Sequence, residues 1–237
     1  MFKREIYGHR GASGVAFENT ISAFQQAVVE GADGIEIDVQ LTKDSVPVVI
    51  HDRNLSRLAS RDRLVDEMNF KSLTRVKLGS LWQRRTKNLY IPTLKEVVHF
   101  CEVHKLKLNV ELKETVAERP EQVRQIMDLI EPIASSVHIS SFHYELIEES
   151  IRHNASIETA YLLKKKQVQR MDWSNYEAAD VFHFHQKYWT SQIAAYAAQR
   201  KYKIRLYGVD GSEKVLQNSP TSIIGWITDY PKRVRQA

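Results

Sequence analysis

The sequence predicts an α/β fold of the (β/α)8 type, a TIM barrel, and three observations lead to this prediction. Short runs rich in β-branched and aromatic residues recur along the whole chain of 237 residues. Several of these runs are apolar on both faces, which is typical of parallel strands that are covered by helices. Stretches of helical length with one apolar face lie between most of the runs. Strands and helices that alternate in this way indicate a closed barrel.

Nine strand-like runs are expected, which is one more than the eight strands of the barrel. The second and third runs are separated only by residues 40–45, a segment too short for a helical crossover. We therefore expect these two runs to form a hairpin or an extended excursion. The expected strands are Glu5–Gly8, Gly34–Val39, Val46–Ile50, Lys107–Leu112, Val137–Ser140, Ile157–Leu163, Val181–His185, Lys203–Gly208 and Ile223–Ile227.

Helix starts are marked by capping residues and prolines. Asn19 or Thr20 is expected to cap a helix that begins at Ile21, and Pro92 and Pro120 each open a further helix. The motif Glu18-Asn19-Thr20 is interpreted as helix capping together with support for His9.

Composition excludes several protein classes. Hydrophobic residues make up 43% of the chain and charged residues 27%, which indicates a packed core rather than disorder. The single cysteine, Cys101, excludes an internal disulfide, and no apolar run approaches the roughly 18–20 residues that span a bilayer. The N-terminus also lacks the apolar stretch of a signal peptide. We expect a cytoplasmic protein.

The positive charge of the chain is concentrated in one segment. The net charge is +5, but ten basic and only three acidic residues lie between Arg53 and Tyr90, so the remainder is slightly acidic. This segment has no clean period, and we interpret about residues 53–91 as an insertion within a single domain that spans residues 1–237. It is either an ordinary solvated lid or a segment that attracts anionic diesters or an anionic lipid surface, through Leu81-Trp82 flanked by Arg84, Arg85 and Lys87. No nucleic-acid-binding motif is present, so nucleic acid is not an expected partner.

Seven polar residues lie near the expected carboxyl ends of four strands, where the active sites of such barrels are found. Residues two apart on a strand share a face, so the pairs on the second and fourth strands should point the same way. The seven are His9 and Arg10 after the first strand, Glu36 and Asp38 on the second, His51 after the third, and Glu111 and Lys113 at the end of the fourth.

The types of these residues indicate a reaction at phosphorus. Three carboxylates offer hard oxygen ligands to one divalent cation, Mg²⁺ or Ca²⁺, and without a cation they would repel one another. Arg10 and Lys113 suit an anionic phosphoryl group. His9 and His51 titrate near neutrality and could serve as general base and general acid. Cleavage of a phosphodiester uses all of these groups.

The motifs that carry these residues resemble the glycerophosphodiester phosphodiesterase family along nearly the full chain. The resemblance implies a TIM barrel with a small insertion after His51, and hydrolysis of glycerophosphodiesters to glycerol 3-phosphate and an alcohol. It also implies His9 and His51 as the acid–base pair, Glu36, Asp38 and Glu111 as metal ligands, and Arg10 and Lys113 as phosphate ligands. The matching motifs are His9-Arg10-Gly11, Glu18-Asn19-Thr20, Glu36-x-Asp38, His51-Asp52, Ile91-Pro92-Thr93-Leu94, Glu111-x-Lys113, Ser141-Phe142 and Thr228-Asp229-Tyr230-Pro231.

The chain departs from the family pattern near its C-terminus. It has Tyr207-Gly208-Val209-Asp210 where the family usually has Trp-Thr-Val-Asn. Tyr207 keeps an aromatic wall for the substrate, and His185, near the end of a late strand, either touches substrate or packs in the barrel. Two alternatives stay open: lysophospholipase D-like cleavage of a lipid-bearing glycerophosphodiester, and a catalytically silent phosphodiester-binding protein. The histidine pair disfavours the second, because a binding protein needs no acid–base groups.

Overall fold

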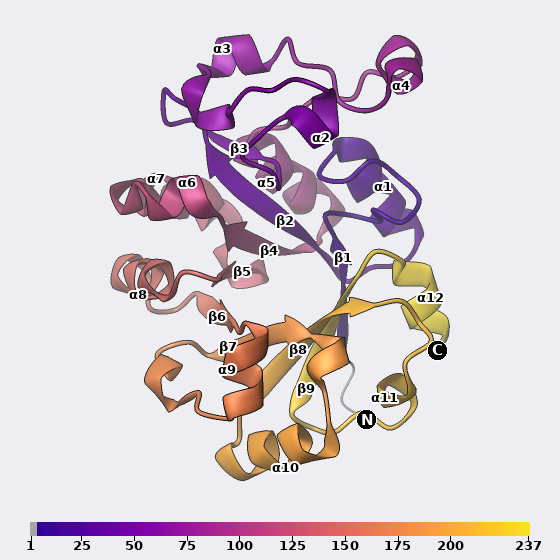
Figure 1. The fold of residues 1–237 in the computed structure, drawn as a ribbon, viewed down its shortest axis with the longest axis vertical. Coiled ribbons are helices and arrows are strands. Elements are labelled where there is room, and N and C mark those ends of the chain that lie inside the picture. Colours follow the sequence, from indigo (N-terminus) through magenta and orange to yellow (C-terminus); the bar gives the residue numbers. More distant parts are fainter. Residues whose placement is uncertain (1–3) are drawn as a thin grey trace.

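The computed structural model describes residues 4–237, which form a closed barrel of parallel strands (Figure 1). Hydrogen bonding connects the strands in the order β1-β9-β8-β7-β6-β5-β4-β2, and a pairing of β1 with β2 closes the ring. The predicted eight-stranded barrel is confirmed. The strands are β1 (Glu5–His9), β2 (Gly34–Leu41), β3 (Pro47–Val49), β4 (Lys107–Leu112), β5 (Val137–Ser141), β6 (Glu158–Leu162), β7 (Val181–His185), β8 (Lys203–Val209) and β9 (Ile223–Thr228).

The extra strand, β3, forms the predicted hairpin. It pairs antiparallel with the end of β2, where Val39 lies opposite Val49 and Leu41 opposite Pro47. β2 therefore extends beyond its parallel pairing within the barrel, and β3 returns the chain to the carboxyl end of the barrel. The backbone N–H of Ile50 donates to the carbonyl of Asp38 (2.9 Å), so the segment that carries His51 is fixed directly beside β2.

Helices cover the outside of the barrel (Figure 1), and most of the buried apolar side chains form one cluster between these helices and the strands. Thr20 caps the first helix through its hydroxyl, as one of the two predicted candidates. The α-helices are α1 (Ile21–Val29), α2 (Ser56–Ala59), α3 (Phe70–Leu73), α4 (Leu81–Thr86), α5 (Leu94–His104), α6 (Glu114–Ala117), α7 (Val123–Ile130), α8 (Tyr144–His153), α9 (Lys165–Arg170), α10 (Ser191–Arg200), α11 (Lys214–Gln217) and α12 (Pro231–Gln236). Short 3₁₀ helices lie at Val65–Glu67, Pro120–Gln122, Glu131–Ser136, Ser174–Tyr176 and Gln186–Tyr188. None of the helices in residues 4–237 is long and apolar enough to cross a membrane.

Buried polar and aromatic side chains occupy the amino end of the barrel, beside a small cavity of about 140 Å³. His138 and His183 meet edge to face with ring centroids 5.6 Å apart, and Tyr7 packs against His138 in the same way at 5.1 Å. Arg205 forms ion pairs with Glu5 and Glu158 beneath them. Burial lowers the pKa of both histidines well below the usual value, so both rings are neutral. These side chains form a floor under the barrel.

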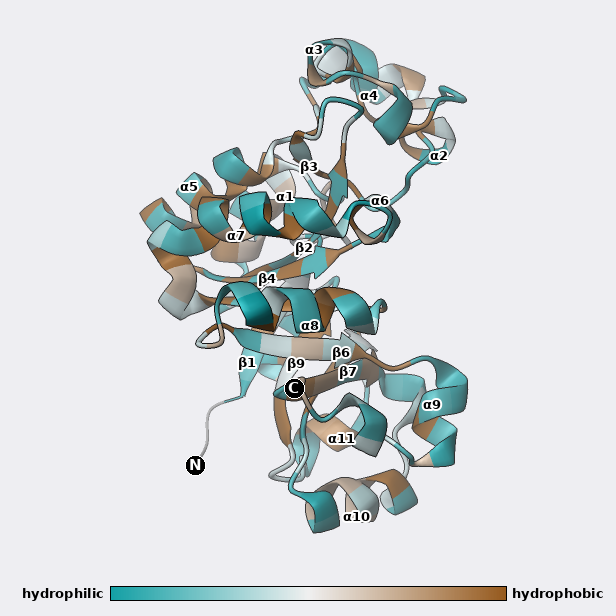
Figure 2. Ribbon diagram, turned by 90° about the vertical axis from the view of Figure 1, so that its left-hand side faces the viewer, coloured by the Kyte–Doolittle hydropathy of each residue, from teal (hydrophilic) through white to brown (hydrophobic). Residues whose placement is uncertain are grey.

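The segment between β3 and α5 folds over a small apolar core of its own, and in Figure 2 its helices α2, α3 and α4 stand beyond β3, away from the other helices. We call residues 53–91 the insertion. Arg53 connects it to the barrel, because its guanidinium binds Asp66 within the insertion and Glu118 after α6. The core of the insertion comprises Leu55, Leu58, Ala59, Val65, Leu73, Val76, Leu78, Leu89 and Ile91, together with Val48 and Ile50.

Thr93, which lies in one of the family motifs, has a structural function as the cap of α5. Its hydroxyl accepts from the backbone N–H of Glu96, and the Glu96 carboxylate accepts from the backbone N–H of Thr93 at 2.7 Å. We predict that Thr93→Ala lowers the free energy of unfolding by about 0.5–2 kcal/mol, because the first turn loses this capping box. Urea denaturation measures this loss, and kcat should stay unchanged. A large loss of activity at full stability would contradict the capping function.

Candidate active site

The carboxyl ends of the strands surround one cavity of about 390 Å³. Six of the seven predicted catalytic, phosphate-binding and metal-binding residues line it directly, and so does Tyr207 of the predicted substrate wall. Asp38 is just beneath the cavity surface, because neighbouring side chains cover its carboxylate. The lining residues include His9, Arg10, Glu36, His51, Glu111, Lys113, Phe142, Leu162, His183, His185, Tyr207, Gly208 and Asp229.

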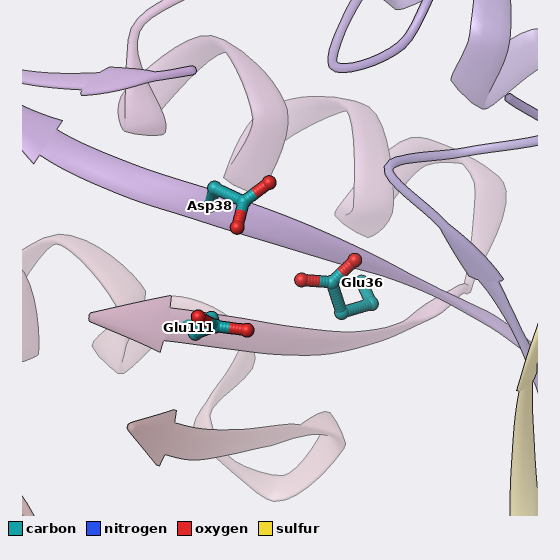
Figure 3. A group of neighbouring side chains, drawn as sticks. All are labelled: Glu36, Asp38 and Glu111. Carbon is teal, nitrogen blue, oxygen red and sulfur yellow. The ribbon is translucent and has the colours of Figure 1, made fainter. Parts of the chain in front are cut away.

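Three buried carboxylates lie together at this end of the barrel. Asp38 of β2 and Glu111 of β4 are register partners, and Glu36 lies two residues before Asp38 on the same face of β2. Figure 3 shows the three carboxyl groups turned toward a common space. One oxygen from each lies within 4.8 Å of the others, as a shared metal ion requires. The predicted set of metal ligands is therefore brought together by strand register alone.

The carboxylate cluster is electrostatically strained in the absence of a cation. Burial and the nearby charge of Asp38 raise the pKa of Glu36 to about 8, and burial also raises the pKa of Glu111. One oxygen of Glu36, Oε1, is buried without a hydrogen-bond partner. Hard anionic oxygens with an unsatisfied lone pair fit Mg²⁺ or Ca²⁺, so the residues present suit a divalent cation.

Lys113 and Arg10 flank the cluster. The Lys113 ammonium is 2.7 Å from Glu111 Oε1 and 3.4 Å from Asp38 Oδ1, while Arg10 Nε is 3.1 Å from Asp38 Oδ2. Although burial opposes ionisation of Asp38, Lys113 and Arg10 hold its pKa below the usual range. The two cationic side chains therefore keep one carboxylate of the cluster charged, and both line the cavity.

A tight turn after β1 aims Arg10 at the cluster. Arg10 has φ 55°, and its backbone N–H donates to Glu36 Oε2 at 2.9 Å. Gly11 follows with φ 85°, and a Cβ there would meet backbone atoms of Ala23 in α1 at 2.6–2.7 Å. Only glycine allows this close approach of the turn to α1. The motif His9-Arg10-Gly11 is thus explained by backbone geometry as well as by side-chain chemistry.

Each of the two predicted acid–base histidines is hydrogen-bonded to an aspartate through Nδ1. His9 Nδ1 is 2.6 Å from Asp229 Oδ1, and His51 Nδ1 is 2.6 Å from Asp52 Oδ1. This contact leaves Nε2 of each ring as the nitrogen available to the cavity. Against the effect of burial, Asp229 and Glu36 raise the pKa of His9, so its protonated form is stabilised.

The functions of Asp229 and Asp52 were not predicted from the sequence. Asp229 directly follows β9, at the carboxyl end where site residues of a barrel are expected, so its position was an available signal. Asp52 directly follows His51, and only the side-chain geometry shows that it binds the ring. Ser13 also donates to Asp229 Oδ1 at 2.8 Å.

The motif Glu18-Asn19-Thr20 supports the site, but not through His9. Asn19, with φ 53°, donates from its side-chain amide to Asp38 Oδ2 at 2.8 Å. Glu18 accepts from Arg10 Nη1 at 2.9 Å. The expected support of His9 by this motif is not found among the described contacts, because His9 is held by Asp229 at the end of the neighbouring strand β9, while the motif contacts Arg10 and Asp38.

The departure from the family pattern near the C-terminus has a steric reason. Gly208 has φ +74°, and a Cβ there would meet the ring of His185 at 2.8 Å. His185 and Tyr207 pack with ring centroids 5.3 Å apart, and both line the cavity. Burial raises the pKa of Tyr207 to about 12, so its hydroxyl stays protonated. The small residue at 208 therefore makes space for His185 in the cavity wall.

Comparison with known proteins identifies the family. The model of the glycerophosphoryl diester phosphodiesterase family matches residues 9–233. The chain belongs to this family. As a phosphodiesterase it is an enzyme, and the resemblance found in its motifs is confirmed. It is 32% identical over 235 residues to the glycerophosphodiester phosphodiesterase of Bacillus altitudinis, covering 97% of this chain and 96% of the relative.

Solved structures share the fold of this phosphodiesterase. A phosphodiesterase of Oleispira antarctica, solved in complex with the product sn-glycerol-3-phosphate, superposes with a TM-score of 0.84 at 24% identity, covering 98% of this chain and 95% of that one. The glycerophosphodiester phosphodiesterase of Thermotoga maritima gives a TM-score of 0.74 at 24% identity, covering 100% and 99%. Both likenesses support the barrel architecture.

The raised pKa of Glu36 predicts how a cation affects stability. The folded metal-free protein holds a proton on Glu36 up to about pH 8, whereas the unfolded chain releases it near the ordinary value of 4.5. The contribution of this proton is present below pH 4.5 and is lost as the pH rises toward 8. We predict that Mg²⁺ or Ca²⁺ raises the melting temperature of chelator-treated protein more at pH 8 than at pH 5, and that Glu36→Gln weakens this effect. Equal shifts at both pH values would contradict the prediction.

Proposed function

We propose that this enzyme hydrolyses glycerophosphodiesters to glycerol 3-phosphate and an alcohol, with one divalent cation and with His9 and His51 as the acid–base pair. The observation that carries the proposal is the pair of aspartate-bound histidines beside a buried three-carboxylate cluster. General acid–base catalysis requires two groups that exchange protons near neutral pH on either side of the reacting phosphorus. We infer the substrate class from the family to which the chain belongs and from the small size of the cavity.

The phosphoryl group would be held by a metal cation and by two cationic side chains. Glu36, Asp38 and Glu111 would bind Mg²⁺ or Ca²⁺, which supplies charge neutralisation and polarises the phosphoryl oxygen. Arg10 and Lys113 would bind the non-bridging oxygens of the phosphate. Both side chains already lie within 3.5 Å of Asp38, at the edge of the cavity. Their charge would thus compensate the phosphate from two directions.

The two histidines would divide the proton transfers. His9 Nε2 would take the proton of the attacking hydroxyl, from water or from the substrate's own glycerol, and His51 Nε2 would protonate the leaving oxygen. Asp229 and Asp52 would keep the Nδ1–H tautomer of each ring and so present Nε2 for exchange. When water attacks, the P–O bond to the alcohol breaks as the P–O bond to the water oxygen forms, and both rings then exchange a proton with solvent. When the glycerol hydroxyl attacks, the same bond to the alcohol breaks and a cyclic phosphate forms; water then opens the ring to glycerol 3-phosphate, with His51 taking the proton of water and His9 returning its proton to the glycerol oxygen.

We predict that His9→Ala and His51→Ala each lower kcat by about 10²–10⁴-fold, because each removes a positioned proton carrier. His99→Ala is the matched control, since the His99 side chain is 75% exposed on α5, and this variant should keep full activity. A substrate with an activated leaving group should restore turnover to the variant that lacks the acid, and only to that one. If it rescues His9→Ala and not His51→Ala, the two functions are reversed; full activity in both variants would refute the pair.

A second candidate, lysophospholipase D-like cleavage at a lipid surface, is favoured by one surface feature. Leu81 and Trp82, in the first turn of α4, are 70% and 66% exposed. Arg85 and Lys87 follow them, and neither forms an ion pair with any residue in 4–237. An exposed Trp-Leu pair beside unpaired cations suits peripheral contact with an anionic lipid surface.

Vesicle sedimentation and substrate comparison test this candidate. We predict that the protein sediments with vesicles that contain anionic phospholipid more than with zwitterionic vesicles, and that a double change of Leu81 and Trp82 to Ser removes the difference. Val29→Ser is the matched control, since Val29 is 79% exposed on α1. Turnover of lysophosphatidylcholine and of glycerophosphocholine is compared in the same samples. Equal sedimentation of all variants, with turnover of glycerophosphocholine alone, would eliminate the lipid candidate. The cytoplasmic location expected from the sequence stays a prediction.

A further inference from the structure

Arg57 belongs to the insertion, yet its guanidinium binds two carboxylates of the site. Nε and Nη2 donate to the two oxygens of Asp52 at 2.5 and 3.0 Å. Nη1 and Nη2 donate to the two oxygens of Glu18 at 2.6 and 2.9 Å. Arg57 is the second residue of α2, so this contact joins the insertion to the mouth of the barrel.

The two carboxylates hold different parts of the site. Asp52 binds His51 Nδ1, and Glu18 binds Arg10 Nη1. Arg57 therefore stands between a proposed proton carrier and a proposed phosphate ligand, one carboxylate away from each. Within the described part of the chain, Arg57 forms no ion pair with any of the three residues of the carboxylate cluster.

We propose that Arg57 is a positioning residue that sets the geometry of His51 and Arg10 together. A carboxylate can rotate about its terminal bond, and a guanidinium that binds both of its oxygens fixes the plane of that group. With Asp52 fixed, the ring of His51 is held with Nε2 toward the cavity. With Glu18 fixed, the guanidinium of Arg10 is held over the carboxylate cluster.

Arg57 is expected to affect the geometry of the site more than the stability of the fold. The Arg57 side chain is 49% exposed, and ion pairs at such exposure contribute little to the free energy of unfolding. The other histidine is held differently, since Asp229 accepts from Ser13 and His9 rather than from an arginine. The insertion therefore reaches the site on the side of His51 and Arg10.

The insertion provides its own control. Arg53 makes the same kind of bridge, because its guanidinium binds both oxygens of Asp66 in the insertion and both oxygens of Glu118 at the barrel. Within residues 4–237, its side chain binds none of the proposed site residues. Arg53→Ala thus removes a connection between insertion and barrel without altering His51 or Arg10, whereas Arg57→Ala alters both.

The inference rests on the proposed function, and the experiment compares variants under metal-supplemented conditions with glycerophosphocholine. Arg57→Ala should lower kcat/KM by about 10–100-fold, the usual cost of removing a group that orients a functional residue. The loss should include both a lower kcat, through His51, and a higher KM, through Arg10. Arg57→Lys, which keeps the charge but not the planar fork, should recover only part of it. Arg53→Ala should change kcat/KM by less than about twofold, as expected for exposed surface changes.

Double variants identify the route. If Arg57 acts through Asp52 and Glu18, adding Arg57→Ala to Asp52→Asn should leave kcat almost unchanged, and adding it to Glu18→Gln should leave KM almost unchanged. Equal losses in Arg53→Ala and Arg57→Ala, or a matching fall in melting temperature, would overturn the inference in favour of simple attachment of the insertion. An active Arg57→Ala variant beside an inactive His51→Ala variant would overturn the inference alone. An active His51→Ala variant would overturn the proposed function itself.

Discussion

The burial of three carboxylates at the end of β2 and β4 is the constraint on which the rest of the site depends. Each charge would be costly in this position without compensation, and most neighbouring groups supply it. Lys113 and Arg10 provide positive charge, the Asn19 amide and the Arg10 backbone N–H donate hydrogen bonds, and the remaining oxygen of Glu36 has no partner within residues 4–237. The protein thus compensates the cluster in part and leaves one carboxylate oxygen, Glu36 Oε1, without a partner among these residues.

The sequence predicted the barrel well because its signals are local. Buried parallel strands are apolar on both faces, and the short spacer at residues 40–45 allowed only a non-helical connection, so the hairpin of β2 and β3 could be expected. The grouping of the three carboxylates could be predicted for the same reason, because residues two apart on a strand share a face and the carboxyl ends of parallel strands meet.

The partners of the histidines could not be predicted in the same way. Asp229 is separated from His9 by 220 positions, and their contact exists only because β9 and β1 are neighbours in the closed ring. Arg57 lies in a segment without periodicity, where no pattern indicates which way a side chain points. Charge counting identified the insertion as basic, but the structure shows that two of its arginines, Arg53 and Arg57, are bound to carboxylates. The field outside the insertion is therefore weaker than its composition suggests.

The floor of the barrel limits how molecules enter and leave the cavity. Among the described residues, His138, His183 and Arg205 are at most 3% exposed, and the cavity shares no lining residue with the smaller one of about 140 Å³ at the amino end. Whatever enters between the strand ends must leave by the same opening. A molecule that remains bound in the cavity therefore blocks the entry of the next one.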